Sequence, residues 1–167
     1  MMPRQEQAMA ELEINISVKQ RLKIPLEESW LQRIAIRTLE AEGICSPVEM
    51  GLVITDSETI QKLNKTYRGE DQPTDVLAFH MVPGTSQESE LRFVGPPDGV
   101  RHLGEVVISY PQAVRQAQEQ GHDVVRELAL LIVHGILHLL GYDDELPEEK
   151  QQMKARENEI LKRLNLI

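Results

Sequence analysis

The sequence has little of several features that mark whole classes of proteins. Its single cysteine, Cys45, cannot form an internal disulfide, which suits a reducing cytoplasm better than an extracellular environment. The longest apolar run, residues 128–133, is far shorter than the roughly 20 residues needed to cross a bilayer. Residues 1–13 also lack the apolar core of a secretory signal. We therefore expect a cytoplasmic protein with no membrane attachment.

Basic residues are in the minority, with 18 lysines and arginines against 27 aspartates and glutamates. Proteins that coat nucleic acid electrostatically need clustered cations, so the overall charge argues against that class. A local basic strip formed by Lys62, Lys65 and Arg68 is still compatible with this composition. A solvated helix face explains the same strip equally well.

The apolar residues that are present alternate in patterns typical of strands and helices. Alternation predicts strands over residues 11–19 and 48–56, and β-rich runs predict two more over 73–81 and 103–110. Helical spacing and capping residues predict five helices, over residues 25–42, 57–69, 109–121, 123–140 and 147–165. We expect a loose tail over 1–10 and a single α+β domain over 11–167, with a mixed sheet of about four strands.

Two segments carry more specific expectations. Ile60, Leu63 and Tyr67 recur at helical spacing and are expected to face the core. Residues 82–102 are rich in glycine, proline and serine, and a structureless loop of that length is uncommon in a compact domain. We expect this segment to be a lid, a small hairpin or a disordered excursion.

The segment HGILHLLGYDD, at residues 134–144, has the spacing of a metal site on the most apolar helix. Residues four apart share a helix face, so His134 and His138 can direct two imidazoles at one ion. Gly141 lets the chain turn sharply, and Asp144 can then return as a third ligand. Three protein ligands leave the open position that a catalytic zinc site requires.

An alternative interpretation is that both histidines are hydrogen-bonded core residues. Imidazoles buried among leucines and isoleucines are costly without partners. Gly135 adds about 1 kcal/mol of cost in a helix interior, so something other than helix stability favours it. Both points favour metal binding. The spacing is also that of metzincin proteases, but Gly135 stands where their glutamate general base would be, so peptidase chemistry does not follow.

At these residues the chain resembles the YbeY family of bacterial single-strand-specific, metal-dependent endoribonucleases. The family signature H-G-x-L-H-L-x-G-Y-D-H is matched at every specified position except the last. Three further stretches resemble family motifs in the same order, namely LNKTYRG at 63–69, PTDVLAF at 73–79 and LGEVVIS at 103–109. The resemblance implies an α+β fold, a zinc ion, and a role in ribosomal RNA maturation and ribosome quality control.

Carried over residue by residue, the resemblance places metal ligands at His134 and His138 and a cleft-facing catalytic arginine at Arg68. The third ligand falls on Asp144, where the family has histidine. Zinc accepts carboxylate oxygens, and such a ligand also makes Mn²⁺ or Mg²⁺ suitable. Asp143 is a rival ligand, but the family has its own aspartate there, so we expect it to support the site through hydrogen bonds.

The expected partners are single-stranded RNA, ribosomal RNA and the small ribosomal subunit. The alternative is a non-catalytic ribosome assembly factor with a structural or degenerate metal site, which the Asp144 departure and the acidic surface favour. His80 stands where the family usually has proline, and is either a general base, an extra ligand or, more simply, a surface histidine at a strand end. Asp75 is expected to be a structural carboxylate. His102 and His122 are expected in polar loops without a chemical role.

Overall fold

The computed structural model describes residues 12–44, 47–80 and 99–166. The expected tail, Cys45 and most of the expected 82–102 loop lie outside the described residues. Within them the chain forms four strands and five helices, as predicted for an α+β domain. In chain order these are β1 (Leu12–Val18), α2 (Glu28–Ala41), β2 (Val48–Thr55), α3 (Ser57–Arg68), β3 (Val76–His80), β4 (Arg101–Ser109), α5 (Tyr110–Gln120), α6 (Val124–Leu139) and α7 (Pro147–Arg163).

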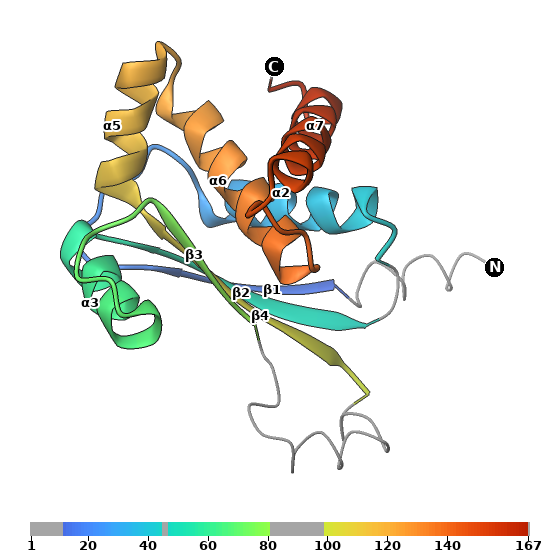
Figure 1. Ribbon diagram of the computed structural model, residues 1–167, viewed down its shortest axis with the longest axis horizontal. Helices are drawn as coiled ribbons and strands as arrows, with labels where there is room; N and C mark the ends of the chain where they lie inside the picture. The colour runs from blue at the N-terminus through green and yellow to red at the C-terminus, as the bar shows by residue number, and fades with distance from the viewer. Residues whose placement is uncertain (1–11, 45–46, 81–98, 167) are drawn as a thin grey trace.

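The four strands form one mixed sheet in the order β1-β2-β4-β3 (Figure 1). β1 pairs with β2 in parallel, and β2 pairs with β4 in parallel. β3 is antiparallel to β4 and lies at the edge of the sheet. Helix α6 packs across β3 and β4, so its residues lie close to that edge.

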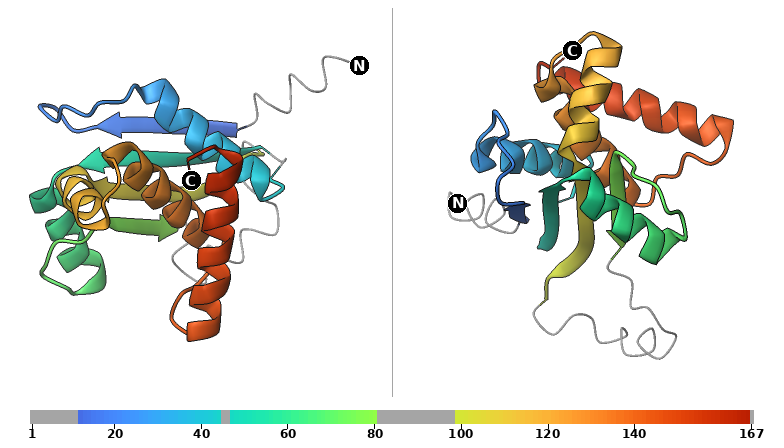
Figure 2. Two further views of the ribbon diagram at one scale, coloured as in Figure 1. Left: turned by 90° about the horizontal axis from the view of Figure 1, so that it is seen from above. Right: turned by 90° about the vertical axis from the view of Figure 1, so that its left-hand side faces the viewer.

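Helices cover both faces of the sheet. Successive side chains of β4 point to opposite faces and show which helices cover each one. Val106 and Ile108 belong to the larger core, which α2, α5 and α6 complete and on which α7 packs. Val107 points to the other face, where it packs with Ile60 of α3 and Leu77 of β3. Figure 2 shows α3 apart from the other helices, on its own side of the strands. None of the described helices is long and apolar enough to cross a membrane.

Gly135 has a packing role that the sequence alone does not reveal. A Cβ atom at this position of α6 would lie 2.5 Å from Cγ1 of Val106 on β4. Such a contact is too short for real Cβ atoms, so only glycine allows α6 to lie this close to the sheet. The close approach explains why a residue that weakens the helix interior occurs here.

Three local expectations differ from the structure. Helix α2 begins at Glu28, so residues 25–27 precede it. Tyr67 is 66% exposed instead of facing the core, because it lies in the last turn of α3, beside the edge strand β3. Its ring contacts Phe79 of β3, with the ring centroids 5.2 Å apart. His102 lies within β4, not in a polar loop, and its Nδ1 is 2.8 Å from Oε1 of Glu49 on the paired strand.

Candidate metal centre

The three residues predicted to bind a metal ion converge on one point. His134 and His138 lie one turn apart on α6, with ring centroids separated by 4.7 Å. Asp144 approaches both rings, and its Oδ2 lies 3.9 Å from Nε2 of His134 and 3.7 Å from Nε2 of His138. One ligand atom from each residue lies within 4.8 Å of the others.

The chain reaches this arrangement through the turn that follows α6. The helix ends at Leu139, and Gly141 adopts a φ of 106°, in the region that favours glycine. The backbone N–H of Asp144 donates a 2.7 Å hydrogen bond to Oδ1 of Asp143. Asp143 therefore fixes the backbone from which the Asp144 carboxylate points, and it is not a member of the ligand cluster.

The spacing of the three ligand atoms fits a single ion. In a tetrahedral zinc site with bonds of about 2.0–2.2 Å, two ligand atoms lie roughly 3.4 Å apart. The two separations that involve Asp144, 3.7 and 3.9 Å, are only slightly longer. Small side-chain rotations close that difference, so this group can hold one metal ion with an open position for a further ligand.

Glu157 of α7 holds the His134 ring, and sequence reasoning missed it. Nδ1 of His134 donates a short hydrogen bond to Oε2 of Glu157, which leaves Nε2 directed at the Asp144 carboxylate. A carboxylate bonded to the second nitrogen of a ligating imidazole fixes its tautomer and orientation. The sequence did carry a signal for this contact. Glu157 shares the apolar face of α7 with Met153, Ile160 and Leu161, and a glutamate is rarely buried unless another group pairs with it.

The charges around His134 change its affinity for protons. Burial alone lowers the pKa of His134, because it disfavours the charged imidazolium. The hydrogen bond and charge of Glu157, with the charges of Asp144 and Asp75, outweigh burial and raise the pKa above its usual value. The same negative charges favour any other cation at this position.

A cavity of about 390 Å³ opens over the ligands and brings three other predicted residues to them. Arg68 is the last residue of α3, which ends where Gly69 adopts a left-handed φ of 74°. Its side chain is exposed, lines this cavity and forms no ion pair within the described parts of the chain. His80, at the exposed end of β3, and Asp75, whose Oδ1 accepts the Val76 N–H at 2.7 Å, line it too.

The remaining two histidines lie away from the ligands. His102 is bonded to Glu49 within the sheet. His122 follows α5, as expected for a loop residue, but its Nε2 lies 2.7 Å from Oε1 of the buried Glu127. Neither residue lines the cavity above the ligands.

Comparison with known proteins decides the family. The model of the family described as "Endoribonuclease YbeY" matches residues 7–165. The chain belongs to this family. It is 42% identical to an endoribonuclease YbeY of Roseiflexus castenholzii, over 94% of this chain and 96% of the relative. A second YbeY endoribonuclease, from Roseiflexus sp. strain RS-1, is 46% identical over 84% of this chain and 86% of the relative.

The fold has a solved counterpart as well. A solution structure of a Thermotoga maritima protein superposes with a TM-score of 0.55 and covers 91% of both chains at 23% identity. At that identity the match supports the fold alone, and it agrees with the α+β architecture described above. The family predicted from the four sequence motifs is thus confirmed, and with it the prediction of an endoribonuclease.

Proposed function

We propose that this YbeY-family chain is a metal-dependent endoribonuclease that cleaves single-stranded RNA, with His134, His138 and Asp144 as the ligands of one ion. The observation that carries the proposal is the convergence of three ligand atoms in a cavity that also contains the exposed guanidinium of Arg68, which forms no ion pair with the residues that the structure describes. Ribosomal RNA in the cytoplasm is the proposed substrate, met on or near the small ribosomal subunit.

Zinc is the proposed ion, because two imidazoles and a carboxylate form a common zinc ligand set. The carboxylate of Asp144, in place of a third imidazole, also suits the harder ions Mn²⁺ and Mg²⁺. When bound, such an ion would polarise a phosphate oxygen and lower the pKa of a water molecule.

The chain's own residues then position the substrate. Arg68 offers a fork of N–H donors to the phosphate oxygens, which stabilises negative charge that develops during cleavage. Glu157 keeps a proton on Nδ1 of His134, so that Nε2 remains available as a ligand. His80 lines the same cavity and is positioned to accept a proton from the attacking hydroxyl, either of water or of the substrate ribose.

Metal content tests the ligand assignment directly. Elemental analysis of protein purified without added metal should find about one ion per chain in the wild type. Asp144→Asn should lose most of it, and Asp144→His should retain it. Asp143→Asn is the matched control, because the amide keeps the oxygen that accepts the Asp144 N–H, so it should retain the ion.

Cleavage of end-labelled RNA tests the activity. The wild type should cut a single-stranded oligonucleotide and leave the duplex of the same sequence intact, and His138→Ala should abolish cutting while the circular dichroism spectrum is unchanged. Full activity in folded His138→Ala would contradict the metal-centred mechanism. A wild type that binds the ion but cuts neither RNA would favour the assembly-factor alternative.

A further inference from the structure

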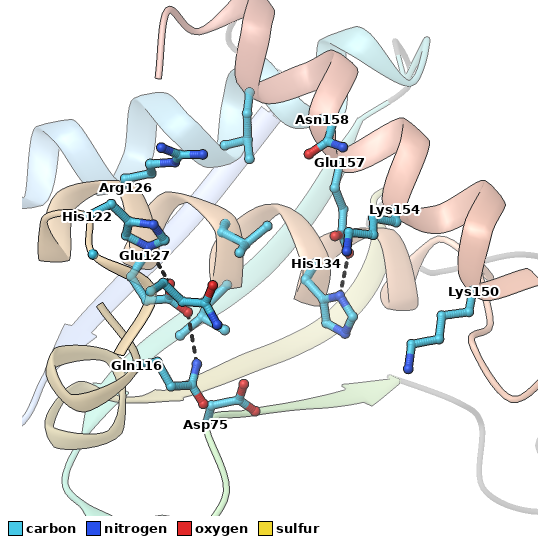
Figure 3. A pocket seen from close by; sticks show the side chains of 15 residues that line it. Asp75, Gln116, His122, Arg126, Glu127, His134, Lys150, Lys154, Glu157 and Asn158 are labelled. Carbon is cyan, nitrogen blue, oxygen red and sulfur yellow. Dashed lines mark hydrogen bonds and ion pairs between the residues drawn. The ribbon is translucent and has the colours of Figure 1, made fainter. Parts of the chain in front are cut away.

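A second cavity, of about 730 Å³, lies beside the metal centre and is lined by residues of α5, α6 and α7 (Figure 3). It shares His134 and Asp75 with the cavity above the ligands. Figure 3 shows His122 and Arg126 towards one end, and Lys150 of α7 towards the other. A bound polymer that occupies the metal centre can therefore continue into this second cavity, along α6 and α7.

Two lysines of α7 line the cavity. Lys150 and Lys154 are four residues apart, so they share a helix face with Glu157, the residue that holds His134. Both lysine side chains are exposed. Neither of them forms an ion pair with a residue in the ranges that the structure describes.

Three carboxylates also line this cavity, and each is bonded within the protein. Asp75 is half-buried and its Oδ1 accepts the Val76 N–H, whereas the other two carboxylates are buried. Glu127 is 3% exposed, accepts a 2.8 Å hydrogen bond from Nε2 of Gln116 and lies 2.7 Å from His122. Glu157 is 7% exposed and is bonded to His134. An anion that enters the cavity therefore meets the exposed ammonium groups of the two lysines before it meets the buried carboxylates of Glu127 and Glu157.

We propose that Lys150 and Lys154 bind backbone phosphates of the RNA that flank the cleaved bond, so that the α6–α7 cavity carries the strand away from the metal centre. The inference rests on the proposed single-stranded RNA substrate. Each phosphate contact releases counterions, so each makes binding more sensitive to salt. The two lysines contribute affinity without acting on the reacting atoms, and their loss should raise KM more than it lowers kcat.

The salt dependence of RNA binding tests this proposal. The full chain, supplied with one equivalent of zinc, is titrated into a fluorescent single-stranded 2′-O-methyl RNA 12-mer that is checked to be intact afterwards. Loss of two phosphate contacts on a single strand should reduce the slope of log K against log salt by about 1.4. Between 50 and 200 mM salt the wild type should therefore lose about sevenfold more affinity than Lys150→Ala/Lys154→Ala.

Matched variants separate this effect from a change in overall charge. Lys162→Ala removes a cation from the same helix outside the cavity, and it should keep the wild-type slope. Lys150→Arg/Lys154→Arg should also keep it. A double alanine variant with the slope of Lys162→Ala overturns the proposed strand path and leaves the proposed function intact. A wild type that does not bind the RNA even at low salt overturns both.

A separate observation concerns the exposed Tyr67. Its ring packs edge-on against Phe79 and lines a cavity of about 580 Å³ on the α3 side of β3. This cavity shares Arg68 and His80 with the one above the ligands. Proteins that recognise single-stranded RNA stack its unpaired bases on exposed aromatic rings. We infer that Tyr67 stacks on a base of the bound RNA, next to the phosphate held by Arg68.

The same titration tests the stacking proposal. Tyr67→Ala should weaken RNA binding at least about fivefold with an unchanged salt slope, because a stacked base contributes about 1–3 kcal/mol. Tyr67→Phe keeps the ring and should bind as the wild type does. Leu146→Ala is the control, since Leu146 is another large apolar side chain that is strongly exposed, at 60%. Wild-type affinity in Tyr67→Ala, or equal losses in Tyr67→Ala and Tyr67→Phe, would overturn the proposal.

Discussion

The bond between His134 and Glu157 yields the sharpest prediction about the metal centre. Glu157→Leu removes the acceptor for Nδ1 of His134, and the imidazole is then free to rotate or to change tautomer. Changes in such supporting carboxylates typically cost 10–100-fold in metal affinity or activity. We expect a loss of about that size for Glu157→Leu, because nothing else in the described part of the chain bonds to Nδ1.

A graded series shows whether the charge or the hydrogen bond matters. Glu157→Gln keeps an acceptor oxygen but removes the charge. A hydrogen bond to a charged group contributes about 1.5–3 kcal/mol and a neutral one about 0.5–1.5 kcal/mol, so the glutamine variant should lose roughly half as much free energy of metal binding. Glu148→Gln, on an exposed turn of the same helix, is the control for a lost negative charge.

Competition against a chromophoric zinc chelator measures the affinities, and cleavage of single-stranded RNA at saturating zinc measures the activity. Thermal unfolding of the metal-free variants separates a loss of fold from a loss of affinity. Metal affinity and activity of Glu157→Leu equal to those of Glu148→Gln would refute the idea that Glu157 positions the ligand.

Three further predictions concern packing, capping and metal removal. Gly135→Ala should destabilise the fold in urea by about 1–3 kcal/mol, because its Cβ would meet Val106, and Val106→Ala in the same chain should restore part of the loss. Asp56→Asn keeps an oxygen for the Thr59 N–H but loses the ion pair with Lys19 and the negative charge at the helix N-terminus, so it should cost about 0.5–2 kcal/mol at pH 6. The bond to Lys19, followed by those to Thr59, holds the pKa of Asp56 well below its usual value, so this difference from wild type should shrink as the pH falls below about 4. Chelation should abolish RNA cleavage with little change in Tm, whereas a large fall in Tm would indicate a structural ion.

The fold could largely be predicted from local pattern. β1 alternates strictly, β2 alternates except at Val53, and the apolar run of α6 identifies the central helix, so the four strands and five helices follow largely from hydrophobic period, β-rich runs and capping residues. The prediction for Tyr67 was wrong because helical spacing shows which face of the helix a side chain lies on. It does not show whether the sheet extends far enough to cover that side chain. β3 is the edge strand, and α3 extends beyond the surface that can bury its last turn.

The site could be predicted only as far as one segment of chain determines it. His134, His138 and Asp144 lie within a single helix and turn, so their spacing implied their convergence. Glu157 lies 23 residues further on, and its contact with His134 depends on how α7 packs on α6. Sequence reasoning treated Gly135 as a sign of metal binding, but its contact with Val106 shows that tertiary packing is sufficient to explain it.

The charges lining the cavity above the proposed metal ligands connect the proposed metal to the proposed substrate. Asp75, Asp143, Asp144 and Glu145 line it together with one guanidinium, that of Arg68. A phosphodiester that approached these side chains alone would meet a surplus of negative charge, and a cavity focuses that repulsion. A divalent cation held by His134, His138 and Asp144, as proposed, would offset much of this negative charge where the phosphate is expected to bind. The acidic composition of the chain is thus compatible with an RNA substrate, provided that cations act locally: the ion and Arg68 at the cleaved bond, and Lys150 and Lys154 beside it.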